Sequence, residues 1–172
     1  MSYDTVLTTE RLKLRRYRAD DLEVLLPVLG DPVSMRYYPH PFSRDECAAW
    51  IESQLRSYEA DGFGLWAIEL RETGAFVGDC GPAVRTVDGT REVEVGWHVH
   101  PEHQNQGIAT EAGLACRDYV FQTLGLTRLI SLVRPENVPS CRVAEKLGMH
   151  IEKVTPYGSG GWLHRVYVAD PA

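Results

Sequence analysis

The stretch that decides the fold is Gln104-Asn105-Gln106-Gly107-Ile108-Ala109-Thr110-Glu111-Ala112, which joins a predicted strand to a predicted helix through a polar turn. The first turn of a helix leaves backbone N–H groups unpaired at the positive end of the helix dipole, and this arrangement suits a phosphate group. Gly107 lets the backbone approach a ligand closely, although a glycine here also fits a tight turn without a ligand. No Lys-Ser or Lys-Thr pair follows the glycine and no GxGxxG pattern is present, which argues against nucleoside triphosphate and dinucleotide loops.

The segments on either side of this turn predict one domain over residues 1–172, of the α/β or α+β class. The strand before the turn, Glu92 to His100, has the clearest period of two, with Glu94, Gly96, His98 and His100 on its polar face. Further strands are predicted at residues 12–16, 65–70, 76–80, 129–133, 149–154 and 164–168. Helices are predicted at residues 22–29, 43–61, 108–124 and 140–147.

Composition excludes several classes of protein. The formal net charge is −6 and the pI is about 5.5, which is the wrong sign for a protein that binds nucleic acid through phosphates, and weakly favours amine-bearing partners. We expect no membrane span, because no run of about 18 apolar residues occurs. The four cysteines form no CxxC pair and predict free thiols, so that the expected location is the cytoplasm.

The motifs around the turn resemble those of the GNAT N-acetyltransferases. Gln104-x-x-Gly107-x-Ala109 is similar to the acyl-CoA pyrophosphate loop of that family. The flanking motifs, and the opening Thr9-Glu-Arg-Leu-Lys-Leu-Arg15, resemble the ribosomal-protein N-terminal acetyltransferase (RimJ/RimL-like) branch; they include Glu94-Val-Gly-Trp97, Asn137-Val-Pro-Ser140 and Glu145-Lys-Leu-Gly-Met149. This resemblance covers nearly the whole chain.

The resemblance implies acetyl-CoA as the co-substrate, and a mixed, mostly antiparallel sheet of about seven strands with about four flanking helices. In this family two neighbouring strands splay apart, and the cofactor lies between them. The resemblance assigns the pyrophosphate to the loop amides and the pantetheine arm to the preceding strand and the second crossover. The implied cofactor-binding residues are His98, Val99, His100, Gln104, Asn105, Gln106, Gly107, Ile108, Ala109, Thr110 and Asn137.

Acetyl transfer from a thioester needs a neutral amine, a stabilised oxyanion and a proton for the departing thiolate. Glu94 is the candidate general base, directly or through water; the alternative is a solvated or ion-paired carboxylate. Strand amides near Val99 would serve the oxyanion, as in the family. Ser140 is the candidate donor to the thiolate, because many family members carry a tyrosine where this chain has Ala144. Alternatively, Ser140 only satisfies a backbone amide at a helix start.

The predicted function is transfer of acetyl to a primary amine, either a small molecule or a protein N-terminus, by direct attack in a ternary complex. The alternative is a catalytically silent acyl-CoA-binding or sensory domain. Candidate acceptor contacts are Tyr37, Tyr38, His40 and Tyr157, which lie in loops rich in proline or glycine. We expect no metal, because no carboxylate or thiol is grouped with His98, His100 and His103. A homodimer paired through residues 164–168 is possible by analogy with the family.

Overall fold

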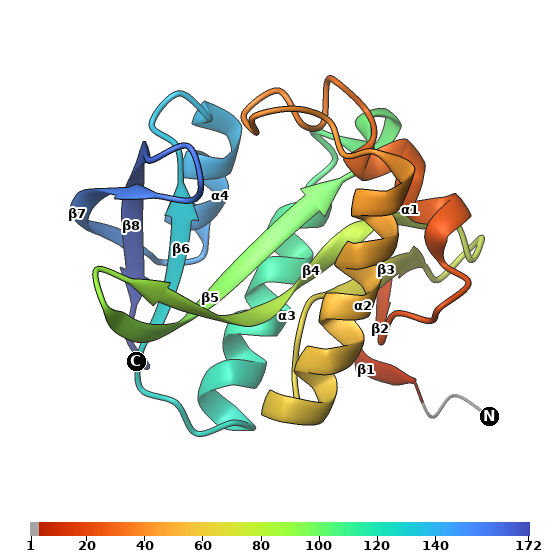
Figure 1. The fold of residues 1–172 in the computed structure, drawn as a ribbon. Helices are drawn as coiled ribbons and strands as arrows, with labels where there is room; N and C mark the ends of the chain where they lie inside the picture. Colours follow the sequence, from red (N-terminus) through yellow and green to blue (C-terminus); the bar gives the residue numbers. More distant parts are fainter. Residues whose placement is uncertain (1–3) are drawn as a thin grey trace.

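The computed structural model describes residues 4–172, and in this part of the chain eight strands form one sheet (Figure 1). The strand order is β1-β2-β3-β4-β5-β6-β8-β7, and every neighbouring pair is antiparallel except β5 and β6. The strands are β1 Thr5–Thr8, β2 Leu12–Arg15, β3 Trp66–Leu70, β4 Phe76–Val87, β5 Thr90–Val99, β6 Leu129–Val133, β7 His150–Tyr157 and β8 Trp162–Ala169. The mixed, mostly antiparallel sheet predicted from the sequence is confirmed.

Four α-helices were expected, and all four are present among the described residues. They are α1 Leu22–Leu29, α2 Arg44–Asp61, α3 Ile108–Gln122 and α4 Val138–Lys146; a short 3-10 helix, η1 Pro101–His103, precedes the Gln104 turn. Ser43 begins α2 with the predicted capping box, in which its side chain accepts from the Glu46 amide while the Glu46 carboxylate accepts from the Ser43 amide. The predicted start of α4 at Ser140 is wrong by a short distance. Asn137 is the N-cap of α4, and Pro139 lies in the first turn, where a missing N–H costs little.

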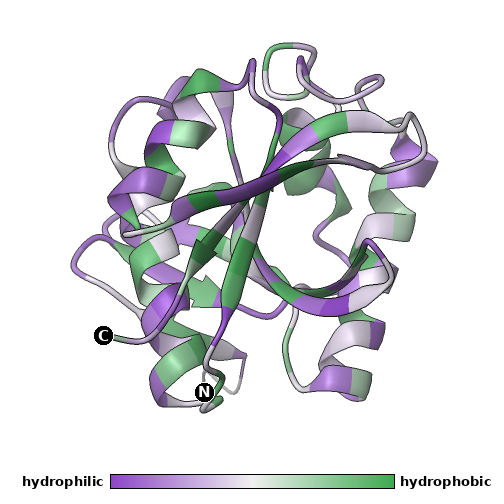
Figure 2. Ribbon diagram, turned by 90° about the vertical axis from the view of Figure 1, so that its left-hand side faces the viewer, coloured by the Kyte–Doolittle hydropathy of each residue, from purple (hydrophilic) through white to green (hydrophobic). Residues whose placement is uncertain are grey.

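Helices cover both faces of the sheet. The α1 and α2 helices lie on one face, and α3 with α4 lies on the other (Figure 1). Figure 2 shows hydrophilic and hydrophobic segments alternating along the helices, as expected of elements with one buried face. On the α3 face, Trp66 is 1% exposed and its ring packs edge-on against Tyr119, with the ring centroids 5.2 Å apart.

Two strands differ from the prediction. The strand expected at residues 76–80 continues to Val87, and β1 adds an edge strand that was not predicted. The longer strand contains Pro82, although proline cannot donate to a ladder. However, β3 pairs with β4 only as far as Cys80, so beyond that residue the missing N–H of Pro82 leaves no β3 partner unsatisfied. The longer β4 provides Arg85, which lines the cleft described below.

The position of β8 bears on the predicted dimer. Residues 164–168 lie in β8, which is hydrogen-bonded to β6 on one side and to β7 on the other. A strand paired on both sides has no free edge for a second chain. Within one chain these residues therefore have no free backbone edge, and β7 holds the free edge at this end of the sheet. The pairing of two chains through residues 164–168 stays a prediction.

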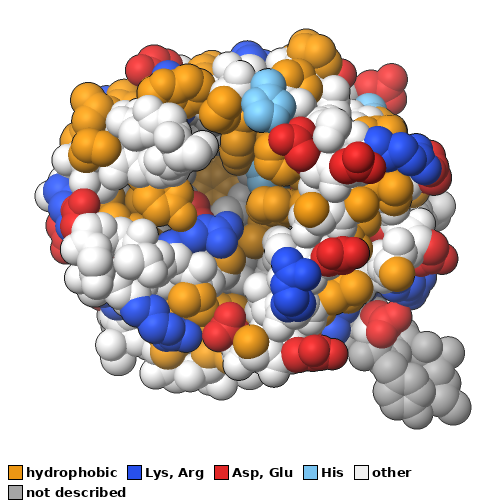
Figure 3. Space-filling view, in the orientation of Figure 1, with side chains coloured by type: hydrophobic (Ala, Val, Ile, Leu, Met, Phe, Trp, Pro, Cys, Tyr) orange, Lys and Arg blue, Asp and Glu red, His pale blue; other side chains and the backbone are white. Residues whose placement is uncertain are grey.

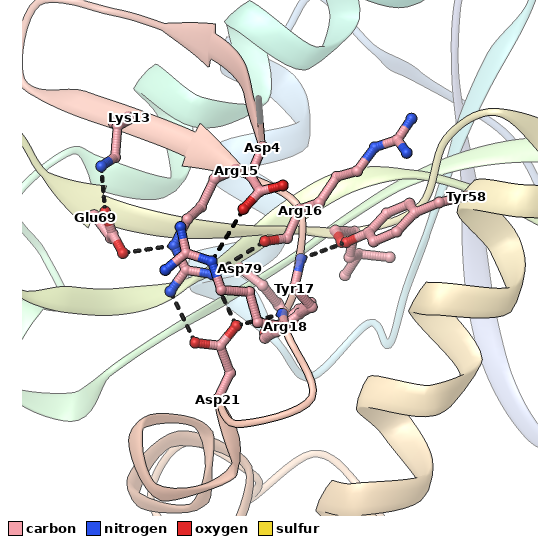
Figure 4. A network of polar contacts seen from close by, with 11 residues as sticks. Asp4, Lys13, Arg15, Arg16, Tyr17, Arg18, Asp21, Tyr58, Glu69 and Asp79 are labelled. Atoms are coloured by element: carbon pink, nitrogen blue, oxygen red, sulfur yellow. Dashed lines mark hydrogen bonds and ion pairs between the residues drawn. The ribbon is translucent and has the colours of Figure 1, made fainter. Parts of the chain in front are cut away.

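A buried ion-pair network supports the N-terminal part of the sheet (Figure 4). The Arg15 guanidinium donates to both carboxylate oxygens of Asp21, each at 2.8 Å, and to Glu69 Oε1 at 2.6 Å. Next along the chain, the amide of Tyr17 donates to the Tyr58 hydroxyl at 3.0 Å, and the Tyr17 hydroxyl donates to Asp79 Oδ2 at 2.8 Å. The network thus connects the end of β2 to the buried Asp79 carboxylate of β4.

Candidate active site

The central parallel strands, β5 and β6, separate along their length. They are paired at Glu94 and Ile130, and one residue further along β5 the carbonyl of Val95 accepts a hydrogen bond from the Ser131 hydroxyl instead of from backbone. Figure 1 shows the two strands diverging from there, with α4 beside one and the loop between α1 and α2 beside the other. A wedge-shaped opening therefore lies in the middle of the sheet.

Backbone groups of β5 face this opening. Successive residues of a strand direct their N–H and C=O groups to opposite sides. The His100 amide donates to Val77 of β4, whereas the Val95 and Val99 carbonyls accept from side chains on the other side. By this alternation, the backbone groups of Trp97 and Val99 point into the opening, and those of His98 and His100 point towards β4.

The turn into α3 closes one end of the opening. Gly107 is the N-cap of α3 with φ +79°, a left-handed conformation that favours glycine. The Glu111 amide donates to the Gly107 carbonyl at 3.0 Å and begins the helical ladder. Among the residues that the structure describes, the amides of residues 107–110 have no acceptor. They form the unpaired, positive end of a 15-residue helix, as the sequence predicted.

Arg11 and Glu111 hold this turn in place. The Glu111 carboxylate accepts from the Thr9 hydroxyl at 2.6 Å, from the Arg11 amide at 2.9 Å and from Arg11 Nε at 2.6 Å. Arg11 Nη1 then donates to the Gln106 carbonyl at 2.9 Å. Burial alone would raise the pKa of Glu111, but the hydrogen bonds from Thr9 and Arg11 lower it. The carboxylate is thereby kept charged and fastens the turn to β2.

A cleft of about 1090 Å³ occupies the opening. Figure 3 shows it as a hollow in the face seen in Figure 1, with hydrophobic side chains around it and a basic side chain at its margin. Its charged lining is five basic residues against two acidic ones: Arg36, Arg85, Arg134, Arg142 and Lys146, and Glu46 and Glu94. The net charge of −6 is therefore not concentrated in the cleft, which is locally positive and suits a polyphosphate.

On the α2 side of the cleft, a chain of hydrogen bonds runs through three side chains. The Tyr38 hydroxyl is 2.7 Å from His98 Nε2, and His98 Nδ1 is 2.7 Å from Asp79 Oδ1. Asp79 is 0% exposed, and its other oxygen accepts from Tyr17 and from Trp50 Nε1. From the sequence, Tyr38 was predicted to contact the acceptor and His98 to bind the cofactor. In the structure the two side chains are in direct contact.

Glu94 lies on the same face of β5 and lines the cleft. Its Oε2 accepts from Arg85 Nε at 2.8 Å, and the glutamate side chain is 13% exposed. The ion-paired alternative considered for Glu94 is thus what the structure shows for one oxygen. Within residues 4–172, no side chain is bonded to the other oxygen, which remains able to meet a ligand.

Ser140 lies on the opposite side, in the first turn of α4. Trp97 Nε1 donates to Ser140 Oγ at 3.2 Å, and the Ser140 amide is bound by the Asn137 side chain. An indole N–H can only donate, so the Ser140 oxygen is the acceptor and its own proton is directed elsewhere. No described residue accepts that proton. Because Asn137 is the cap, the alternative role of Ser140 as a helix cap does not apply.

The other predicted residues divide between the cleft and its surroundings. Gln104 lines the cleft and donates to the Val99 carbonyl at 3.1 Å. His40 also lines it, but its Nε2 is 2.8 Å from the Glu46 carboxylate at the start of α2. The remaining predicted residues in the lining are Tyr37, Val99, Asn105, Gly107, Ile108, Ala109, Thr110, Asn137, Ser140 and Tyr157, whereas Gln106 and His100 lie outside it.

Several residues of the site were missed from the sequence. Asp79 lay within a predicted strand and Trp50 within a predicted helix, and neither was assigned to the site; Arg85 lay beyond the predicted end of its strand. A signal for Asp79 was available, because a single carboxylate inside a buried strand is rare unless it is paired. Arg85 and Trp50 gave no such signal, since their roles depend on which strands and helices are neighbours.

Two searches of the described residues found nothing. Residues 4–172 contain no group of three or more His, Cys, Asp or Glu side chains placed to hold a metal ion. In the same range, no helix has the length and apolar character needed to cross a membrane. All four cysteines are buried and free, as predicted.

Comparison with known proteins identifies the family. Residues 11–150 match the model described as an acetyltransferase (GNAT) domain. YkkB, an uncharacterized protein of Bacillus subtilis (strain 168), is 34% identical over 154 residues, covering 89% of this chain and 90% of that protein. The uncharacterized N-acetyltransferase YnaD of the same strain is 30% identical over 161 residues, covering 91% of each. The crystal structure of an acetyltransferase from Agrobacterium tumefaciens str. C58 superposes with a TM-score of 0.84 and 30% identity, covering 99% of this chain and 96% of that chain.

The overall arrangement of the sheet and its helices is thus shared with a known acetyltransferase. The chain belongs to the GNAT acetyltransferase family, and its architecture is the GNAT fold.

Proposed function

We propose that this protein transfers the acetyl group of acetyl-CoA to a primary amine by direct attack in a ternary complex. The observation that carries the proposal is the divergence of β5 from β6 next to the free amides of residues 107–110. The opening accommodates an extended pantetheine arm, and the amides suit a pyrophosphate. Backbone groups of Trp97 and Val99 would bind the arm, and Gln104, Asn105 and the helix start would bind the phosphates. The cleft's basic side chains add favourable charge.

In this reaction the protein must deprotonate the amine, stabilise the oxyanion and protonate the departing thiolate. Glu94, with one oxygen held by Arg85, would attract the ammonium form of the acceptor and take its first proton, directly or through water. The Val99 amide would stabilise the oxyanion that forms when the amine attacks the thioester carbonyl. Ser140, whose hydroxyl proton has no acceptor among the described residues, would donate to the departing thiolate. No covalent enzyme intermediate is required.

The acceptor is either a protein N-terminus or a small amine. The residues shared with the RimJ/RimL-like branch support a protein N-terminus, and a small amine is the alternative. A cytoplasmic location fits the four free thiols. A silent acyl-CoA-binding domain is the second candidate function, supported by Ala144 at the position of the usual tyrosine.

An amine panel tests this proposal. Purified protein is incubated with acetyl-CoA and a set of peptides with free N-termini, polyamines and amino acids, and the release of free thiol is measured. We expect amine-dependent release with at least one acceptor. Binding of acetyl-CoA without such release would favour the silent domain, and failure to bind acetyl-CoA would contradict both functions.

Ser140→Ala is expected to lower kcat about 100-fold while the KM for acetyl-CoA changes less than about twofold, because the hydroxyl acts on the thiolate only as it leaves. Steady-state kinetics with the acceptor found in the panel measure both constants. Ser140→Thr keeps the hydroxyl and is the matched control, expected to retain most of the activity. A folded alanine variant with unchanged kcat would remove Ser140 from the mechanism.

Glu111→Gln is expected to raise the KM for acetyl-CoA about 3- to 10-fold, equivalent to about 0.7–1.4 kcal/mol. The substitution removes the negative charge and replaces the oxygen that accepts from Arg11 Nε with an amide nitrogen, which can only donate. The Gln106 carbonyl then loses the fixed position that Arg11 gives it. Glu52→Gln, which affects only an exposed pair with Arg56 on α2, is the control and should leave the KM unchanged. Equal KM values in both variants would show that the Arg11–Glu111 pair does not position the turn.

A further inference from the structure

A chain of hydrogen bonds begins at the Asp79 carboxylate and ends in the cleft. It is fully buried on β4 and receives hydrogen bonds from Tyr17, Trp50 and His98. Within the described part of the chain, no Lys or Arg side chain forms an ion pair with it. His98 is therefore the partner that can bring a positive charge to this buried carboxylate.

This environment selects one tautomer of His98. A carboxylate only accepts hydrogen bonds, so His98 Nδ1 carries the proton that faces Asp79. His98 Nε2 then has a free lone pair, and the Tyr38 hydroxyl donates to it over 2.7 Å. The oxygen of Tyr38 retains its own lone pairs, and both Tyr38 and His98 line the cleft. Desolvation of this hydroxyl raises the pKa of Tyr38, and the charges of Glu94 and Asp79 raise it further, so that Tyr38 remains protonated until its proton moves to His98.

The hydrogen-bond chain from Asp79 to Tyr38 lies where the amine must react. His98 lies between Trp97 and Val99, whose backbone groups point into the opening between β5 and β6. Glu94 and Arg85 lie further along the same face of the sheet. The Tyr38 side chain reaches this face from the loop between α1 and α2, and its ring packs on His98 with the centroids 5.5 Å apart.

We propose that Tyr38, His98 and Asp79 form a proton relay that accepts the proton released when the amine attacks acetyl-CoA, a role that rests on the proposed function. The N–C bond forms and the C–S bond breaks, with its electron pair remaining on sulfur. The proton of the attacking nitrogen passes to the Tyr38 oxygen as the Tyr38 proton passes to His98 Nε2, and Asp79 stabilises the imidazolium. The imidazolium then returns a proton to solvent through Tyr38, and the thiolate is protonated by Ser140 and water. Tyr38 contacts the substrate, whereas His98 acts through Tyr38, and Asp79 acts through His98.

The pH profile of kcat tests the relay. The charged and titratable groups around His98 come from four elements: Asp79 and Arg85 from β4, Glu94 from β5, Glu46 from α2, and Tyr38 from the loop, with Tyr17 behind Asp79. In the wild-type protein, with the acceptor found in the amine panel, we expect kcat to rise with pH and then to reach a plateau. Tyr38→Phe and His98→Asn are expected to lower kcat by about 100-fold or more and to abolish the plateau, so that the residual rate rises with hydroxide concentration. Asparagine retains a donor for Asp79 but cannot accept the proton.

Tyr17→Phe is the matched control, because it removes a tyrosine hydroxyl from the same carboxylate but not from the path to the cleft. It should retain the plateau. A plateau that survives in both Tyr38→Phe and His98→Asn, or that disappears only in Glu94→Gln, would overturn the relay alone. Wild-type protein that binds acetyl-CoA but releases no thiol with any amine would overturn the proposed function and, with it, the relay.

Discussion

Gly107→Val is expected to raise the KM for acetyl-CoA at least about 10-fold, the largest effect of any single change outside the reacting groups. The left-handed conformation at φ +79° costs a residue with a side chain about 1–2 kcal/mol, and more for a β-branched one. A Cβ at this position would lie 3.4 Å from Arg11 Nη2, which is an ordinary van der Waals contact, so the strain comes from the backbone. Relief of the backbone strain moves the amides of residues 107–110. Calorimetric titration with acetyl-CoA, or with CoA, measures the loss; about 1.4 kcal/mol corresponds to each factor of ten.

Gly125→Val provides the matched control for this experiment. Gly125 has φ +67° just beyond α3, and a Cβ there would meet no atom within 4 Å. It therefore carries a comparable backbone strain away from the cleft. Both variants should lose some stability, but only Gly107→Val should lose affinity. Wild-type affinity in a folded Gly107→Val protein would show that the turn does not bind the phosphates.

Arg15→Ala is expected to lower the free energy of unfolding by about 3–5 kcal/mol, because it leaves the buried Asp21 and the partly buried Glu69 without their shared cation. The Arg15 side chain is 5% exposed, so water cannot replace the guanidinium. Equilibrium unfolding in urea measures the change. Arg18→Ala breaks a pair with Asp4 whose side chains are about half exposed, and is expected to cost at most about 1 kcal/mol.

The ion pairs of Arg15 with Asp21 and Glu69 also predict how the free energy of unfolding depends on pH. Burial tends to raise the pKa of Asp21 and Glu69, but hydrogen bonds from Arg15, and from Lys13 to Glu69, lower both below their ordinary values of 3.8 and 4.5. A carboxyl whose pKa is lowered by folding stabilises the protein above its ordinary pKa, and this contribution is lost as the pH falls through the lowered value. The difference in stability between wild-type and Arg15→Ala should therefore narrow in acid. A constant difference between pH 7 and pH 3 would contradict this assignment.

Local patterns predicted most of the elements, because these patterns act over a few residues. The capping box at Ser43 and Glu46 specified the start of α2, and the alternation of polar and apolar residues specified β5. The start of α3 at Ile108 followed from the glycine before it. The predicted end of β4 at residue 80 was wrong. The strand continues past Pro82 to Val87, because no β3 residue requires the missing N–H there.

Part of the candidate site was also predicted from a local pattern of residues. The phosphate-binding turn is a contiguous segment, so that its unpaired amides follow from the position of a helix start. The proposed relay joins Tyr38, Asp79 and His98 from three separate segments, and its members meet because β4 pairs with β5 in a register that sets Asp79 beside His98. The spacing of these three residues along the sequence does not indicate that they are in contact.

The sequence by itself determined the class of fold, the turn at Gly107, and the resemblance that led to the acetyltransferase family. The fold class and the turn depend on hydrogen bonding and hydrophobic periodicity within single elements, and the resemblance depends on short motifs; the order of residues contains all of these directly. Only the tertiary structure decided that Glu94 is paired with Arg85, that Asn137 rather than Ser140 caps α4, and that a buried carboxylate supports His98. Such contacts depend on strand register and on the packing of α2 over the sheet, since burial and hydrogen-bond partners are properties of neighbours in space.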